Sequence, residues 1–297
     1  MTTLSLVRSR SFRILVPLAL CGLAVPTATN ASAPETLKGD LTVYAAASLT
    51  DAFAGIEEAF EEEYDGVDVS VETGASSDLV DQINEGAPAD VFASADQNNM
   101  DKLVDAGNNA SEPETFATNS LAIIVEPGNP QGITGVESLT DSDLIFVTTA
   151  PEVPIGAYTQ EVFEAAGIEV TSDSEEENVR AIVDKVVEGE ADAGVVYITD
   201  VLAAGDDAEG VEIPVDINIV AEYPIAVTAE AANPDAAAAF VEFVVSEDGQ
   251  AILAENGFGP IDAATTETSG PADTMGTDTM GTDTMTADTM VPDTTTA

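Results

Sequence analysis

Between Leu41 and Asp262 the sequence alternates short β-branched runs with longer segments of helical spacing. In one such segment Phe53, Ile56 and Phe60 share a helix face, while glutamates occupy the opposite face. Strands that alternate with helices indicate an α/β fold with largely parallel sheets. We expect strands at 41–45, 67–71, 90–93, 121–125, 144–147, 193–196 and 225–228, and further helices at 79–85, 97–106, 157–166, 179–188 and 234–245.

The length of this region favours two lobes. About 220 residues are large for one such sheet and suit two lobes of about 100 residues each. We place the crossings near Asn119 and Glu222, so that residues 40–119 plus 223–262 form the first lobe and 120–222 the second. Two crossings of this kind would form a hinge.

The two ends of the chain differ from the alternating region. Arginines at 8, 10 and 13 precede the apolar run 14–25, which is too short to span a bilayer, and small residues follow. Residues 1–33 are therefore predicted to be a signal peptide, cleaved after Ala31 or Ala33. Cys21 either carries a lipid anchor or is removed with the peptide. Residues 263–297 repeat Asp-Thr-Met with a period of five, and we expect a disordered tail that is a spacer or a thioether site for Cu(I).

The composition disfavours several classes of site. The chain has no histidine and one cysteine, so zinc sites and imidazole or thiol catalysis are not expected in the folded part. It has 56 acidic residues and a formal net charge of −49 at pH 7, and beyond the signal peptide its only basic residues are Lys38, Lys102, Arg180 and Lys185. Such a surface repels nucleic acid and suits a saline medium that screens its charge.

Two serines lie where a predicted strand passes into a helix. Ser48 begins a Ser-Leu-Thr-Asp capping box that ends at Asp51, and Ser76 precedes the helix at 79–85. Helix N-termini at the carboxyl ends of parallel strands offer free amides and a partial positive charge, so they can bind an anion without arginine. The alternative is that both serines are ordinary N-caps.

Five ordered motifs lie at 43–53 (VYAAASLTDAF), 86–96 (GAPADVFASAD), 153–158 (VPIGAY), 178–180 (NVR) and 194–200 (GVVYITD). Together they resemble the periplasmic molybdate-binding proteins of ABC importers. Two further matches are the return strand at 222–227 and Gly257-Phe258, so the resemblance spans nearly all of 41–260. It implies a type II periplasmic-binding-protein fold, with two Rossmann-like lobes, a hinge and a cleft between the lobes.

The resemblance also implies a ligand set and a role. The oxyanion ligands fall on the hydroxyls and amides of Ser48 and Ser76, the amides of Ile155 and Val179, and the phenol of Tyr197. The implied function is high-affinity extracytoplasmic binding of molybdate or tungstate by a monomer and delivery to a membrane permease, with no catalysis, cofactor or direct metal ligand. Two alternatives stay open: a sulfate or thiosulfate receptor, and an acidic surface protein outside transport.

Some residues near the motifs need separate interpretations. Ile155 stands where many relatives have alanine, and Asp78 would oppose a dianion unless it points to water. We expect Asp96 to cap a helix and Asp90 to fix a loop. Arg180 either balances the charge of the cleft or pairs with one of the glutamates at 175–177.

Overall fold

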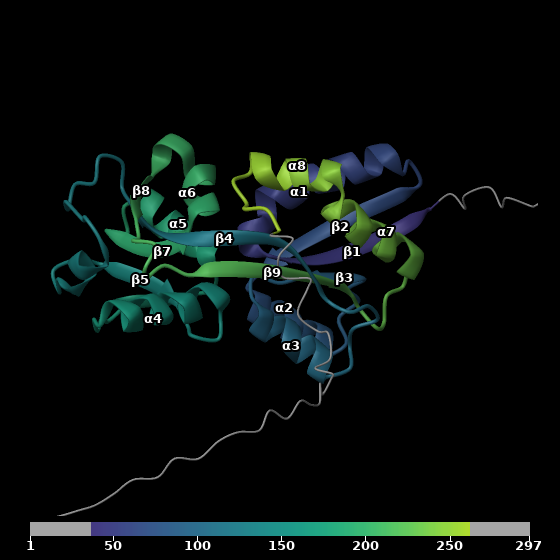
Figure 1. Ribbon diagram of the computed structural model, residues 1–297, viewed down its shortest axis with the longest axis horizontal. Coiled ribbons are helices and arrows are strands. Elements are labelled where there is room, and N and C mark those ends of the chain that lie inside the picture. The colour runs from purple at the N-terminus through teal and green to yellow at the C-terminus, as the bar shows by residue number, and fades with distance from the viewer. Residues whose placement is uncertain (1–36, 262–297) are drawn as a thin grey trace, which may run out of the picture.

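The computed structural model describes residues 37–261, where helices and strands alternate along the chain (Figure 1). The predicted signal peptide with Cys21 and the predicted tail lie outside the described residues. The strands are β1 (Gly39–Ala46), β2 (Val67–Gly74), β3 (Val91–Ala93), β4 (Glu114–Val125), β5 (Phe146–Thr149), β6 (Ser174–Glu176), β7 (Ala193–Tyr197), β8 (Glu209–Glu212) and β9 (Val220–Val227). The helices are α1 (Thr50–Glu63), α2 (Ser76–Asn84), α3 (Gln97–Asp105), α4 (Pro154–Ala166), α5 (Val179–Val187), α6 (Ile198–Ala204), α7 (Pro234–Val245) and α8 (Glu247–Glu255). Every predicted element overlaps one of these.

The strands form a continuous sheet of mixed direction. Their order is β2-β1-β3-β9-β4-β7-β5-β6, and β8 also pairs with β4. The pairings β1–β2, β1–β3, β5–β6 and β5–β7 are parallel, whereas every pairing of β4 or β9 is antiparallel. The expectation of a largely parallel sheet is therefore wrong for β4 and β9, because these two strands run alongside each other in opposite directions.

Strands β4 and β9 join the two ends of the sheet. Residues 114–120 of β4 pair with β9, residues 121–125 pair with β7, and residues 122–125 also pair with β8. Strand β9 pairs with β4 from Val220 to Ile225 and with β3 from Ile225 to Val227. The change of partners thus falls near the residues proposed as crossings. The division into lobes at 119 and 222 itself stays a prediction.

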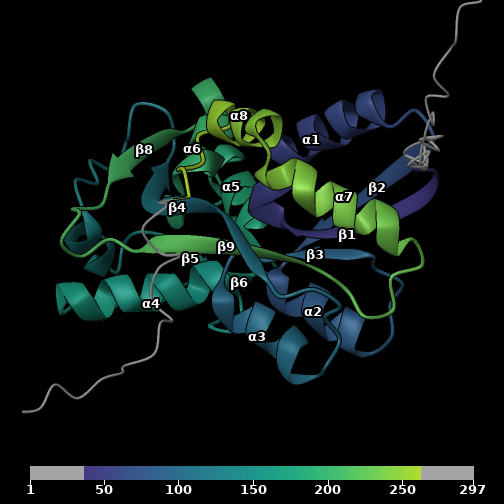
Figure 2. The ribbon, with the colours of Figure 1, turned by 45° about the vertical axis from the view of Figure 1, so that its right-hand side comes forward.

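Helices cover both faces of the sheet. In both views α1 and α8 lie on one side of β1 and α2 and α3 on the other, and Figure 2 shows α7 on the side of α1 (Figures 1 and 2). The predicted stripe of α1 is confirmed, since Phe53, Ile56 and Phe60 are fully buried. Phe60 packs edge-on against Phe240 of α7 with ring centroids 5.2 Å apart. This packing fixes α1, whose N-terminus lies next to the end of β1.

Within residues 37–261, no helix combines the length and the apolar character that a membrane crossing needs.

Candidate functional site

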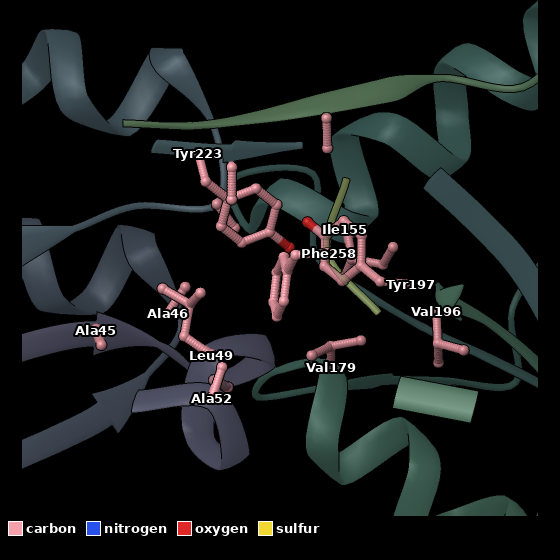
Figure 3. Close-up of a cluster of buried hydrophobic side chains, with 14 of the residues drawn as sticks. Ala45, Ala46, Leu49, Ala52, Ile155, Val179, Val196, Tyr197, Tyr223 and Phe258 are labelled. Carbon is pink, nitrogen blue, oxygen red and sulfur yellow. The ribbon is translucent and has the colours of Figure 1, made fainter. Parts of the chain in front are cut away.

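A small cavity lies among the ends of four elements. It has a volume of about 20 Å³, which is room for about one water molecule. Four of the five predicted ligand residues line it: Ser76, the first residue of α2; Ile155, the second of α4; Val179, the first of α5; and Tyr197, the last of β7. Figure 3 shows Ile155, Val179 and Tyr197 on the side opposite Ala46, at the end of β1. The fold therefore brings residues from 46 to 197 to one point.

Ser48 lies beside this cavity and not on it. The neighbouring Ala46 and Ala47 line the cavity, whereas Ser48 lines an adjacent pocket of about 130 Å³ with Arg180. Its hydroxyl shares a hydrogen bond of 2.9 Å with the hydroxyl of Tyr223. In this structure the β1–α1 junction thus borders the cavity through residues 46 and 47, and the role of Ser48 as a ligand stays a prediction.

Neither serine is an N-cap, so the predicted capping box is wrong. Helix α1 starts only at Thr50, after a 3-10 turn at Ala47–Leu49, and no side chain caps it. This turn places Ser48 too early to bond the first turn of α1, and its hydroxyl bonds Tyr223 instead. Ser76 lies inside α2, where its Oγ accepts a hydrogen bond of 3.0 Å from the amide of Ala95. The first amides of α1 and α2 are therefore not used by these side chains.

The helix N-termini at the cavity keep amides available as donors. No side chain caps α2 or α4. In α5 the side chain of Asn178 accepts from the amides of Arg180 (3.0 Å) and Ala181 (3.2 Å), and it leaves the amide of Val179 free of this cap. The first amides of a helix have no partner within the helix and carry a partial positive charge. Three helices thus direct donors and positive ends toward one cavity.

Gly156 allows α4 to begin so close to the cavity. A Cβ atom at this position would lie 2.3 Å from the carbonyl oxygen of Ala150 and 2.7 Å from that of Thr149. Backbone atoms cannot yield at such distances, so the first turn of α4 packs against the end of β5 only because residue 156 has no side chain. The amide of Ile155 takes its position from this contact.

The hydroxyl of Tyr197 is buried without a hydrogen-bond partner among the described residues. The side chain is 1% exposed, and its ring packs against that of Tyr223 with centroids 5.8 Å apart (Figure 3). Burial raises the pKa of Tyr197 well above its ordinary value, so the hydroxyl keeps its proton and can donate it. Leaving a buried polar group unpaired costs about 1–3 kcal/mol. A donor held at this cost in a cavity points to a bound acceptor.

Arg180 pairs with aspartates and not with the glutamates at 175–177. Its Nη2 bonds the carboxylate of Asp51 on α1, and its Nε donates to the carbonyl of Ala47 at 3.3 Å. Nε also lies 3.4 Å from Oδ1 of Asp200, whose Oδ2 accepts from the amide of Tyr197 at 3.0 Å. Burial raises the pKa of Asp200 to about 6, against the opposing charge of Arg180. Of the two interpretations of Arg180, pairing with the glutamates is wrong, because its side chain turns toward α1.

Comparison with known proteins identifies the family. The profile of the bacterial extracellular solute-binding proteins matches residues 41–259. The chain belongs to this family. The molybdate-binding protein ModA of Mycobacterium tuberculosis is 38% identical over 84% of this chain and 95% of its own length.

Solved structures agree with this assignment. The substrate-binding domain of a putative molybdenum ABC transporter from Clostridium difficile is 31% identical, with a TM-score of 0.57 over 75% of this chain and 99% of that one. The sulfate-binding protein SubI of M. tuberculosis shares the fold, with a TM-score of 0.69 at 22% identity over 76% of this chain and 88% of that one. The periplasmic-binding-protein fold predicted from the motifs is confirmed.

Two residues of this solute-binding protein had no role in the motif analysis. Tyr223 packs its ring against that of Tyr197 and shares a hydrogen bond with the hydroxyl of Ser48, and it lies in the return-strand motif, where its burial was not apparent. Asn178 was noted only as the residue before Val179, although Asx residues at a helix start are typical caps. Asp96 and Asp90 are confirmed in structural roles: Asp96 caps α3 by accepting from the amide of Asn99 (3.1 Å), and Asp90 holds the loop before α7 by accepting from the amide of Asn233 (3.0 Å).

The two departures from the motif pattern are both placed by the structure. Asp78 is exposed, as a carboxylate near an anion site should be. The side chain of Ile155 is 1% exposed and narrows the cavity, while its amide stays in the first turn of α4. Across residues 37–261, no group of three or more acidic side chains could hold a metal ion.

Proposed function

We propose that this solute-binding protein captures a tetrahedral oxyanion, molybdate or tungstate, in the cavity and delivers it to the membrane permease of an ABC importer. The observation that carries the proposal is the buried, unpartnered hydroxyl of Tyr197 among the N-termini of α2, α4 and α5. The proposed ligands are the hydroxyls of Tyr197 and Ser76 and the amides of Ser76, Ile155 and Val179. The junction at Ser48 completes the set after a small shift of the β1–α1 turn.

The chemistry of the donors favours a fully deprotonated anion. Such an anion offers only acceptor oxygens, and the cavity offers hydroxyls and amides but no carboxylate. The proton of a hydrogen phosphate would face another donor, and that unmet contact would cost free energy. The negative charge of a dianion would be balanced by three helix N-termini at short range.

The relatives favour molybdate over sulfate. The molybdate-binding ModA relative is 38% identical, whereas the sulfate-binding SubI, at 22% identity, supports only the shared fold. Donors on both sides of a closed cleft would fix the distance between them, and this distance would separate molybdate and tungstate from the smaller sulfate.

Binding would require the cleft to open and close. The cavity of about 20 Å³ is too small for an ion of five heavy atoms, so the two proposed lobes must separate slightly around β4 and β9. Contacts cross this cleft beside the cavity: the hydroxyl of Tyr158 lies 3.5 Å from the carbonyl oxygen of Ala95, and Arg180 bonds Asp51. The ligand would select a closed form slightly wider than the present one, with the cleft shut around the ion, and a permease could recognise that form.

The remaining parts of the proposal concern the whole chain. The protein would be exported through the leader at 1–33 and act as a monomer outside the cytoplasm, either lipid-anchored at Cys21 or free. It would bind without catalysis and without a cofactor, and its acidic surface would exclude nucleic acid.

Calorimetric titration of the mature protein with molybdate, tungstate, sulfate and phosphate tests the proposal. We expect submicromolar binding of molybdate and tungstate and much weaker binding of the other two. Ser76→Ala should weaken binding, whereas Ser77→Ala, a neighbouring buried serine that does not line the cavity, should not. Tight sulfate binding without molybdate binding would instead identify a sulfate receptor, and no binding of any oxyanion would favour the surface-protein alternative.

A further inference from the structure

Arg180 connects the two sides of the cleft next to the cavity. It follows Val179 at the start of α5, and its guanidinium reaches the β1–α1 junction, where it bonds the carboxylate of Asp51 and the carbonyl of Ala47. On its own side of the cleft it lies 3.4 Å from Oδ1 of Asp200. One side chain therefore joins the starts of α1, α5 and α6.

Two of these contacts, those with Ala47 and Asp200, are one step from the cavity. Ala47 lines the cavity, and the carboxylate of Asp200 accepts from the amide of Tyr197, whose hydroxyl is the unpartnered donor. Arg180 itself is not among the lining residues. Its charge therefore acts on the position of the walls and not on the ligand directly.

We propose that Arg180 is a closure latch, a positioning residue that holds the cleft shut through Asp51 and Ala47 and so sets how slowly the oxyanion leaves. The proposal rests on the proposed function and adds to it a determinant of residence time outside the ligand set.

The geometry separates the contacts that change on opening from those that do not. Asp200 and Arg180 both lie in the segment 120–222, so their contact persists when the cleft opens. The contacts with Asp51 and Ala47 cross to the other side and must break. Asp200 is fully buried and keeps the guanidinium in place, while the side chain of Asp51 is 53% exposed. The buried carboxylate of Asp200 thus holds the guanidinium in position, and the guanidinium bonds the exposed carboxylate of Asp51 when the cleft closes.

The test compares Arg180→Gln with wild type by stopped-flow molybdate binding. The chain has no tryptophan, so the signal is tyrosine fluorescence, to which Tyr197 and Tyr223 contribute. We expect the dissociation rate to rise about tenfold with the association rate nearly unchanged, since hydrogen bonds to charged groups are lost only from the closed form. Arg180→Lys should raise the dissociation rate less than Arg180→Gln does, because lysine keeps the charge but lacks the planar fork of donors.

The matched control is Lys185→Gln. Lys185 lies on the same helix, and its charge pairs at the surface with Glu190, so its removal should leave both rates as in wild type. Circular dichroism and urea unfolding of each variant establish that the fold is kept. The latch would be overturned if Lys185→Gln raised the dissociation rate as much as Arg180→Gln. It would also be overturned if the dissociation rate rose only in variants that had lost their fold.

A second pair of variants, Asp51→Asn and Asp78→Asn, distinguishes two roles for Asp51, as a partner of the latch or as a charge that repels the anion. The two roles predict changes of opposite sign in molybdate affinity. Asp51 and Asp78 both lie in the first turn of a helix at the cleft, and Asp78 is exposed and forms no salt bridge within residues 37–261. If the two acids acted only by repelling the dianion, both Asp→Asn variants would bind molybdate more tightly. The latch predicts that Asp51→Asn binds about threefold more weakly, while Asp78→Asn binds equally or more tightly. In the Asp51→Asn variant, the further change Arg180→Gln should lower molybdate affinity less than it does in the wild-type protein.

The outcomes separate the latch from the proposed function. Absence of molybdate binding by wild type would overturn the function and the latch together. Binding by wild type with equal dissociation rates in wild type and Arg180→Gln would overturn the latch alone.

Discussion

Replacing Tyr197 with phenylalanine should have opposite effects on binding and on stability. The variant keeps the buried ring and its packing on Tyr223 and loses only the hydroxyl. In the free protein this hydroxyl has no partner among the described residues, so its removal should stabilise the fold or leave it unchanged, with a gain of up to about 1–3 kcal/mol. In the bound form the hydroxyl would donate to a dianion. A hydrogen bond to a charged group contributes about 1.5–3 kcal/mol, so affinity should fall about 10- to 150-fold.

The two effects are measured on the same samples. Calorimetry gives the molybdate affinity, and urea unfolding without ligand gives the free energy of unfolding. Because burial keeps the phenol protonated, the loss of affinity should be constant across neutral and mildly alkaline pH. An unchanged affinity together with a less stable free protein would show that the hydroxyl has a structural partner and is not a ligand. That result would remove the main support for the site.

Three further predictions concern the backbone packing at Gly156, the protonation of Asp200 and the screening of the acidic surface by salt. Gly156→Ala should lower molybdate affinity more than about tenfold and unfolding free energy by about 2 kcal/mol, because the new Cβ would meet backbone oxygen at 2.3 Å; unchanged calorimetry and urea curves would contradict this. The pKa of Asp200, raised from an ordinary 3.8 to about 6, makes the folded protein bind more protons than the unfolded chain in this range. The contribution of this shift to the free energy of unfolding, about 3 kcal/mol, is therefore fully present below about pH 4 and lost as the pH rises through 6. Asp200→Asn should lack this part of the pH dependence, and urea unfolding of both proteins at about pH 4.5 and about pH 7.5 measures the difference. Molybdate affinity should hold or rise between about 0.1 M and about 1 M chloride, since screening weakens the repulsion from the acidic surface; a steep fall in calorimetric titrations would show that a cation contacts the ligand directly.

The elements of the fold were largely predictable because their signals are local. The stripe of Phe53, Ile56 and Phe60 has the helical period, and it is buried as that period requires. The direction of β4 and β9 was not predictable from such patterns, because an antiparallel partner is chosen by the path of the whole chain. The short strands β6 and β8 have too few residues to show a period, and Glu175 and Glu176 in β6 do not resemble a buried strand.

The site was predictable in its residues and not in its local bonding. The resemblance of the motifs to the molybdate-binding proteins implied Ser76, Ile155, Val179 and Tyr197 as ligands, and these line one cavity. The capping box at Ser48 failed because the 3-10 turn at Ala47–Leu49 delays the start of α1, and nothing in a Ser-x-x-Asp pattern specifies that turn. The partners of Arg180 also escaped prediction, since Asp51 lies 129 residues away in sequence and only the tertiary fold brings the two together.

A donor-only anion site is compatible with a charge of −49 because the acidic residues and the cavity are kept apart. Within the described chain the buried carboxylates are those of Asp90, Asp96 and Asp200, and none of them lines the cavity. Each accepts a hydrogen bond from a backbone amide, and the second oxygen of Asp200, which has no hydrogen-bond partner among the described residues, lies 3.4 Å from Nε of Arg180. The exposed acids act through solvent and are screened over about 10 Å at 0.1 M salt, whereas the helix ends act within about one turn of the cavity. The short-range field at the site is therefore positive even though the long-range field of the protein is negative. Closure of the cleft would strengthen the attraction between the helix ends and the anion, because it would exclude the water that weakens this attraction.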